Sequence, residues 1–366
     1  MATIREVARL AGVSVATVSY VFSGARSVRP ATEARVRAAA ARLGYLPNAA
    51  ARALTTKSGR ILATLVSDVG NPFFAPVLRA IEARARESGY MVVIADTQED
   101  PAHEEDYLRR LALHYVDGLI VSPSSEQRAT ALLKAHWDGR IVVINRRLPG
   151  IDADFVATDN RQGARQLTNY LLDRGHSSVA LIAGSKELST HQERFEGYRE
   201  ALSDRGIGLD DQLVKRVGTT TASAYEATRE LFRFRGNERP SALFVTSGIH
   251  ATGAYQAVLE LGLRIPHDLS FVAFDRADWM TLVSPPITTI QQAADAIGRL
   301  SADLLIERLS LHAGGETREA RQYLLEPVLH EGGSVSRLRH AGERGDPTAA
   351  ARPSRVTTSM STLEER

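Results

Sequence analysis

Polar and charged side chains stand directly after several short apolar segments of this chain, where they could bind a small molecule. These residues are Asn145 and Arg146 after segment 141–144, Ser247 after 242–245, and Asp275 after 270–274. A guanidinium and a carboxylate make charge-assisted hydrogen bonds to hydroxyl and carbonyl groups. The residue types therefore indicate binding chemistry.

Residues arranged for catalysis or metal binding are missing from the sequence. The chain has no cysteine, which excludes disulfides, thiolate chemistry and cysteine zinc sites. Its ten histidines are scattered without ligand spacing, and no His-Glu-x-x-His, Gly-x-Ser-x-Gly or P-loop motif occurs. We therefore expect no catalytic residue, no metal and no cofactor.

From residue 60 onward, apolar strand-like segments alternate with amphipathic helical segments. The expected strands include 61–66, 91–95, 118–121, 141–144, 179–183, 242–245 and 270–274. Such βα repetition predicts parallel sheets covered on both faces, arranged as two α/β lobes. Ligands bind beyond the carboxyl ends of parallel strands, so the polar residues above should face a cleft between the lobes. Further candidates at these strand ends and helix starts are Phe73, Phe74, Thr190, Gln192, Arg194 and Trp279.

The first 46 residues have a different pattern, typical of a three-helix head with a helix-turn-helix. Thr3 and Glu6 fit a capping box at a helix start, Gly12 permits a tight turn, and Ser14 can cap a second helix. A third helix is expected from about Pro30 to Leu43.

Charge is distributed unevenly along a chain whose formal net charge is only +2. Residues 1–60 contain ten Lys and Arg but two acidic residues, which makes the remainder mildly acidic. A basic head on an acidic body predicts a polyanion as the partner of the head alone. No apolar run is long enough to cross a bilayer and no export signal is recognisable, so we expect a cytoplasmic protein without a membrane partner.

Two stretches resemble the lactose-repressor/galactose-repressor (LacI/GalR) family of bacterial transcriptional regulators. They are the opening segment 2–21 and the segment 44–54, Gly-Tyr-Leu-Pro-Asn-Ala-Ala-Ala-Arg-Ala-Leu, and the order of the following elements agrees to about residue 332. The resemblance implies a sequence-specific regulator, expected to be a repressor, that binds double-stranded operator DNA as a homodimer or higher oligomer. It also implies a periplasmic-binding-protein-like body of two doubly wound parallel sheets that binds a small-molecule effector. A sugar is expected from the family, while nucleobases and other polyols stay open as alternatives.

The resemblance also assigns residues to DNA. Val15, Ala16 and Tyr20 would face base edges, and apolar side chains there can only pack on features such as the thymine methyl group. Many relatives carry Arg where this chain has Tyr20. Leu54 would wedge into the minor groove and kink the duplex, or else pack against the body. The full set of expected DNA-binding residues is Thr3, Ser14, Val15, Ala16, Thr17, Ser19, Tyr20, Arg29, Asn48, Ala51, Arg52 and Leu54.

By family position, Arg194 and Asp275 would be the main effector contacts, with Phe74 as the stacking ring. The alternatives are a structural ion pair between Arg194 and Asp275, core packing for Phe73, and plain packing for Trp279. Where many relatives have Asn or Asp after the strand at 242–245, this chain has Gly248, so one ligand-binding side chain is missing.

The expected organisation is a helix-turn-helix domain at 1–46, a hinge helix at 47–59, an effector-binding and dimerisation body at 60–332, and a disordered tail at 333–366. The body divides into lobes at 60–158 plus 291–322 and at 159–290 plus 323–332. Effector binding would change the angle between the lobes and thereby the hinges on DNA. Rival interpretations are an exported solute-binding protein, an enzyme with an accessory DNA module and a nonspecific architectural DNA binder.

Overall fold

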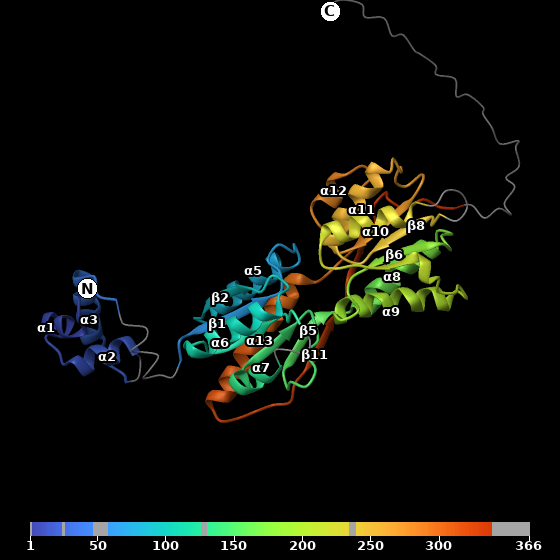
Figure 1. The fold of residues 1–366 in the computed structure, drawn as a ribbon. Coiled ribbons are helices and arrows are strands. Elements are labelled where there is room, and N and C mark those ends of the chain that lie inside the picture. Colours follow the sequence, from blue (N-terminus) through green and yellow to red (C-terminus); the bar gives the residue numbers. More distant parts are fainter. Residues whose placement is uncertain (1, 24–25, 47–57, 126–129, 234–238, 339–366) are drawn as a thin grey trace, which may run out of the picture.

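The fold is that of a computed structural model, which describes residues 2–23, 26–46, 58–125, 130–233 and 239–338. The expected hinge helix falls almost entirely on residues 47–57, which lie outside the described residues. Figure 1 shows the head at one end of the chain and the two lobes of the body following it.

The head folds as three helices around a small apolar core. These are α1 (Ile4–Ala11), α2 (Val15–Ser23) and α3 (Pro30–Leu43). The predicted capping box is present, since Thr3 and Glu6 exchange backbone and side-chain hydrogen bonds. Gly12 then ends α1 in the left-handed region at φ 65°, where glycine has no steric cost. Val7, Val18 and Val36, one from each helix, are fully buried and join the helices.

The first lobe is built on a six-stranded sheet in the order β11-β5-β4-β3-β1-β2, with every pair parallel. Its strands are β1 (Ile61–Val66), β2 (Met91–Asp96), β3 (Gly118–Val121), β4 (Ile141–Ile144), β5 (Asp154–Thr158) and β11 (Gln322–Leu325). Helices α5 (Phe74–Glu87) and α13 (Ala294–Ala313) pack on one face. Helices α6 (Pro101–Leu113) and α7 (Thr130–Trp137) cover the other face.

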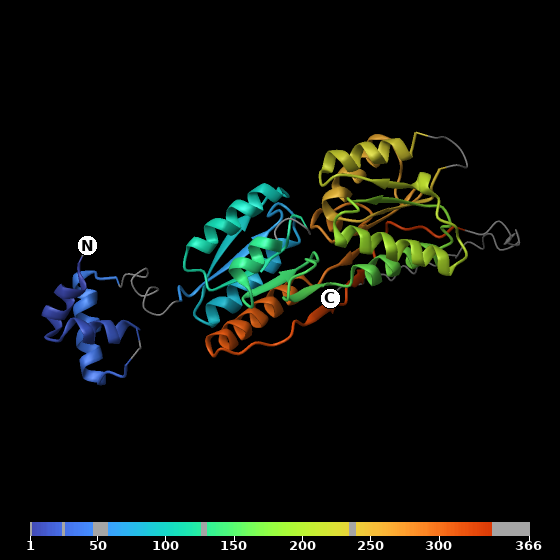
Figure 2. The same cartoon turned by 60° about the horizontal axis from the view of Figure 1, so that its bottom comes forward.

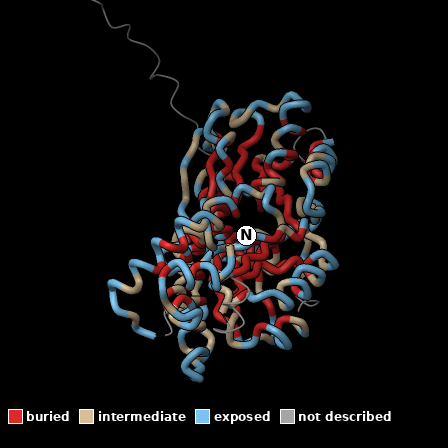
Figure 3. The backbone as a smooth tube through the Cα atoms, turned by 90° about the vertical axis from the view of Figure 1, so that its left-hand side faces the viewer, coloured by how far each residue is buried: buried red, intermediate tan, exposed pale blue. Residues whose placement is uncertain are grey.

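The second lobe repeats this plan with the strand order β12-β10-β9-β8-β6-β7. Its strands are β6 (Val179–Ala183), β7 (Val214–Arg216), β8 (Ala242–Val245), β9 (Ser270–Phe274), β10 (Thr288–Gln291) and the antiparallel β12 (Val328–His330). Helices α8 (Asn160–Leu172) and α9 (Ser189–Asp204) cover one face, and α10 (Thr221–Leu231) and α11 (Gly248–Glu260) cover the other. A short helix, α12 (Trp279–Leu282), precedes β10. Figure 2 shows both lobes as helix-covered sheets, and in Figure 3 buried residues lie in the interior with exposed residues around them.

The chain passes between the lobes after β5, after β10 and after β11. The expected boundary at residue 322 is wrong for β11, because Gln322–Leu325 pairs along its whole length with β5 of the first lobe. The change of lobe comes later, between β11 and β12. The four residue pairs that β11 forms with β5 hold residues 322–325 in the first lobe, so the chain crosses to the second lobe later than the sequence suggested.

The expected disorder from residue 333 is also wrong for its first residues. The Ser334 hydroxyl donates to the carbonyl of Phe271 and accepts from the Thr288 N–H at 2.8 Å. The Ser336 N–H donates to the Ser270 hydroxyl at 3.0 Å. Residues 333–338 are thus held on the second lobe by backbone groups that composition does not reveal, and residues 339–366 lie outside the described residues. Among the described residues, no helix combines the length and apolar character that crossing a bilayer requires.

Candidate ligand cleft and nucleic-acid interface

The outer face of α2 carries the side chains expected to contact DNA. Val15, Ala16 and Ser19 are exposed, while Val18 and Val21 turn into the core of the head. The Ser14 hydroxyl accepts the Thr17 N–H at 3.1 Å and so starts the helix. Thr3, Ser14 and Arg29 are also exposed, and Thr17 and Tyr20 are half-buried. The expected contacts Asn48, Ala51, Arg52 and Leu54 lie outside the described residues.

One cavity between the lobes collects most of the residues predicted to bind a ligand. Its lining includes Phe73, Asn145, Arg146, Thr190, Arg194, Ser247 and Asp275. The first three belong to the first lobe and the others to the second, so the predicted cleft exists. Sequence reasoning did not single out several other lining residues, which are Asp68, Glu99, His191, Thr219, Ile249, His250 and Gln292.

Arg146 forms the charged centre of the first-lobe wall. Its two terminal nitrogens bind both oxygens of Glu99, at 2.7 and 2.6 Å, and one of them also donates to the Pro123 carbonyl at 3.1 Å. Its Nε is buried without a hydrogen bond to any described residue. The charge of Arg146 is therefore matched within the wall, while Nε remains as a donor.

Arg194 forms the corresponding centre of the second-lobe wall. Its Nε donates to Asn160 Oδ1 at 2.8 Å, and Nη1 donates to the Thr246 carbonyl at 2.6 Å. Nη1 lies 3.8 Å from Asp275 Oδ2, and the guanidinium lies 3.8 Å above the ring of Phe274. Burial lowers the pKa of Arg194, and the Asp275 carboxylate opposes this shift. The two residues are thus a braced ion pair that also lines the cavity.

Asp275 is held rigidly at the mouth of the cleft. Its backbone has φ 71°, which is uncommon for a residue with a side chain. One carboxylate oxygen accepts the Gly248 N–H at 3.2 Å and the other accepts Gln292 Nε2 at 2.7 Å. Gly248 thus contributes its backbone N–H, which donates to Asp275, and no side chain.

Three predicted ligand residues do not reach the cavity. Phe74 is 1% exposed in the first-lobe core, because it begins α5 on the face toward the sheet. Phe73 lies one residue earlier and lines the cavity instead, so the expected roles of the two rings are reversed. Gln192 binds Glu196 and Arg216 on the surface of the second lobe. Trp279 packs on Tyr255 at a ring separation of 5.1 Å.

A hydrogen-bond chain joins the lobes beside the cavity. Arg147 of the first lobe donates through Nε to Glu193 Oε1 of the second lobe at 2.8 Å, and its N–H donates to Ser189 Oγ at 3.0 Å. The other oxygen of Glu193 accepts Asn160 Nδ2 at 3.0 Å. Because Asn160 also holds Arg194, the chain links the cavity wall to the interlobe contact.

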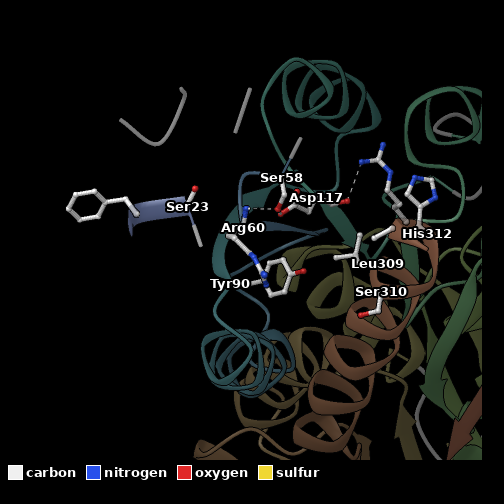
Figure 4. Close-up of a pocket in the computed structure, with 11 residues that line it drawn as sticks. Ser23, Ser58, Arg60, Tyr90, Asp117, Leu309, Ser310 and His312 are labelled. Atoms are coloured by element: carbon white, nitrogen blue, oxygen red, sulfur yellow. Dashed lines mark hydrogen bonds between the residues drawn. The ribbon is translucent and has the colours of Figure 1, made fainter. Parts of the chain in front are cut away.

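A second pocket lies where the chain enters the body (Figure 4). The Asp117 carboxylate there accepts the Ser58 hydroxyl at 3.0 Å and the N–H groups of Gly59 and Ile61 at 3.1 and 3.2 Å. A Cβ at Gly59 would lie 1.9 Å from the Tyr115 carbonyl, so only glycine fits. The segment leading from the head is thus fixed to the first lobe at a single carboxylate.

Two segments of the chain match described families. Residues 3–48 match bacterial regulatory proteins of the lacI family, and residues 168–335 match a periplasmic binding protein-like domain. The HTH-type transcriptional repressor PurR of Aliivibrio fischeri is 33% identical over 338 residues, covering 92% of this chain and 99% of the relative. The chain belongs to the lacI family of bacterial regulatory proteins. The ribose operon repressor of Escherichia coli is 31% identical over 336 residues, covering 92% of this chain and 100% of that repressor.

Solved structures of the family are similar over the same length. The lac repressor dimer bound to operator and the anti-inducer ONPF superposes with a TM-score of 0.79 at 26% identity, covering 92% of this chain and 99% of the other. The complex of the transcriptional regulator CelR with cellobiose gives 0.68 at 30% identity, covering 91% and 100%. These comparisons confirm the predicted family, the helix-turn-helix head, the bilobed body and the function as a DNA-binding transcriptional regulator.

Proposed function

We propose that this lacI-family regulator is a cytoplasmic repressor that binds operator DNA as a homodimer and is switched by a small neutral polyhydroxy compound, a sugar, in the interlobe cleft. The paired charges of the cleft carry the sugar proposal. Glu99 matches Arg146 and Asp275 matches Arg194, so neither guanidinium of the lining is left to attract an anionic ligand, and Asp68 adds a further acceptor. Hydroxyl groups, which donate and accept, suit such a lining.

The relatives support the other parts of this proposal. Two of them are named as transcriptional repressors, and the similar solved structures include a dimer on its operator and a complex with the disaccharide cellobiose. For this chain, the exposed face of α2 would enter the major groove, and the basic head would bind phosphates with a steep dependence on salt. The cleft would bind its effector without converting it.

The link between ligand and DNA would be the lobe angle. An effector that contacts both cavity walls stabilises one lobe arrangement over the other, and it can shift DNA affinity only by its difference in affinity for the two. The segment anchored at Asp117 moves with the first lobe and would carry the change to the hinge. This proposal gives a role to the head, to the cleft and to the contact of Asp117 with the segment that enters the body.

The experiment selects operator sequences from a random duplex library and then measures binding by fluorescence anisotropy. Pentoses, hexoses, disaccharides and nucleobases are added one at a time, and the same compounds are tested by thermal shift on the protein alone. We expect one sugar to raise the melting temperature and to change operator affinity at least tenfold. A protein lacking residues 1–58 should keep the thermal shift and lose DNA binding. Equal operator affinity with every compound, or turnover of the bound sugar, would contradict the proposal.

A further inference from the structure

Two histidines that the mechanism above does not use lie together in the wall of the cleft. His191 belongs to α9 and His250 to α11, and both line the interlobe cavity. Their rings stack with centroids 5.5 Å apart and an interplanar angle of 30°. His250 is 1% exposed and His191 8% exposed, which is unusual for side chains that carry polar nitrogens.

The hydrogen bond of His250 to the backbone fixes its tautomer. Its Nε2 lies 2.7 Å from the carbonyl oxygen of Gly218. A carbonyl only accepts hydrogen bonds, so Nε2 must carry the proton and Nδ1 of the neutral ring must be a lone-pair acceptor. This assignment follows from the hydrogen-bond network. Burial lowers the pKa of His250, the nearby Arg194 lowers it further, and the Gly218 carbonyl and the Asp275 carboxylate oppose the shift.

The acceptor on Nδ1 is unused. It is buried and has no hydrogen bond to any described residue. Neighbouring acceptors of the same wall are already engaged: Asp275 binds Gly248 and Gln292, and Ser247 Oγ accepts the N–H of His250 at 3.3 Å. A buried acceptor without a partner destabilises the protein, so a molecule that supplies a donor there gains binding energy.

We propose that His250 is a specificity-determining residue whose Nδ1 accepts a hydrogen bond from a hydroxyl or N–H group of the effector. This inference rests on the proposed function, because it assumes that the cleft holds the effector. Gly248 begins the same helix and has no side chain, so the acceptor comes instead from His250, two residues later in the first turn of α11. His191 lies against the ring and positions it.

This role restricts the chemistry of the effector. The ligand must present a donor toward α11, and an analogue that lacks this hydroxyl or carries an ether oxygen there leaves Nδ1 unpaired again. Sites built to bond a hydroxyl reject the analogue lacking it strongly, because a buried polar group is then stranded. We expect one deoxy or O-methyl analogue of the effector to bind at least tenfold more weakly to the wild-type protein.

Two substitutions separate ligand recognition from a structural role. His250→Gln places an amide near the position of Nε2, so it keeps a donor for Gly218 and removes the acceptor at Nδ1. His250→Asn places its amide oxygen near the position of Nδ1, so it keeps the acceptor and loses the bond to Gly218. If His250 binds the effector, Gln should weaken binding more than Asn. If His250 only braces the loop at Gly218, the order should be reversed.

The dissociation constants are measured by calorimetry with D-ribose, D-xylose, D-glucose, cellobiose, adenine and hypoxanthine, on wild type and both variants. Operator binding without ligand and the circular dichroism spectrum check that each variant folds. We expect at least a tenfold loss for His250→Gln, a smaller loss for His250→Asn, and no further loss for His250→Gln when the analogue lacks the bonded hydroxyl. A compound that binds wild type and His250→Gln equally overturns this inference alone. A panel in which nothing binds wild type overturns the sugar-cleft proposal and this inference together.

Discussion

The carboxylate of Glu193 reaches Arg147 across the two lobes, with Oε1 2.8 Å from Nε. Both side chains are partly solvent-exposed, at 40% for Arg147 and 24% for Glu193, so this ion pair is of moderate strength. It nevertheless stands beside the cavity and closes a chain through Asn160 to Arg194. The contact therefore favours the lobe arrangement in which Arg147 and Glu193 meet beside the cavity.

Replacing Glu193 by Gln should weaken effector binding about two- to fivefold, since an ion pair of this exposure contributes at most about 1 kcal/mol. The Arg147→Gln variant and the double variant complete a cycle, which should give a coupling energy of about 0.5 kcal/mol or more. Glu200→Gln is the matched control, because Glu200 pairs with Arg161 inside the second lobe. If Glu200→Gln changes the dissociation constant as much as Glu193→Gln does, the interlobe interpretation is wrong.

Replacing Asp117 by Ala should loosen the segment that enters the body, because it removes the acceptor of three hydrogen bonds. We expect operator affinity to fall about tenfold while effector affinity stays within twofold, since the cleft is not touched. Gel-shift titration and calorimetry measure the two quantities. Asp106→Asn, at an exposed ion pair of α6, is the control and should change neither. Parallel losses of both affinities would instead indicate general unfolding.

Replacing Arg194 by Lys keeps the charge and loses the fork that binds Asn160 and the Thr246 carbonyl. We expect effector affinity to fall at least thirtyfold, on the order of 2 kcal/mol, and operator binding without effector to remain. Arg165→Lys is the control, since Arg165 pairs with Asp204 on the surface. An unchanged effector dissociation constant would show that Arg194 only braces the second lobe.

Acidification should destabilise the protein through its buried histidines. Burial lowers the pKa of His176, His191 and His250 below the ordinary value of 6.5. The unfolded chain therefore binds protons that the folded chain refuses as the pH falls below 6.5, and stability is lost in that range. We expect the free energy of unfolding to change little above pH 7 and to fall as the pH drops from 6.5 toward 5. Urea denaturation measures this, and His250→Gln should reduce the slope; an identical slope in that variant would exclude His250 as a contributor.

Local sequence signals predicted the head and most strands well. The Thr3–Glu6 capping box and the left-handed Gly12 are determined within a few residues, and both are found. The cleft residues that follow strands, such as Asn145 and Asp275, were predicted for a related reason: parallel strands place their carboxyl ends together.

Other features depend on contacts that no local pattern encodes. Phe73 and Phe74 are adjacent, and only the exact start of α5 decides which ring faces the core. His191 and His250 are 59 residues apart and meet because α9 and α11 both lead toward the cleft, although α9 and α11 cover opposite faces of the second-lobe sheet. The strand pairing of β11 and the hydrogen bonds of Ser334 are likewise tertiary contacts. Because of them, the lobe boundary and the start of the tail lie further along the chain than the sequence predicted.

The three passages between the lobes leave from one edge of each sheet, since β5 and β11 are neighbours in the first and β10 and β12 in the second. Three connecting segments of the chain along one side of the lobes form a hinge. One lobe can rotate open or closed relative to the other about that hinge. Translation or twisting of one lobe against the other would require all three connections to distort at once. The free energy of ligand binding would thus act on the opening angle between the lobes, and a change of this angle would reach the segment attached at the far end of the first lobe.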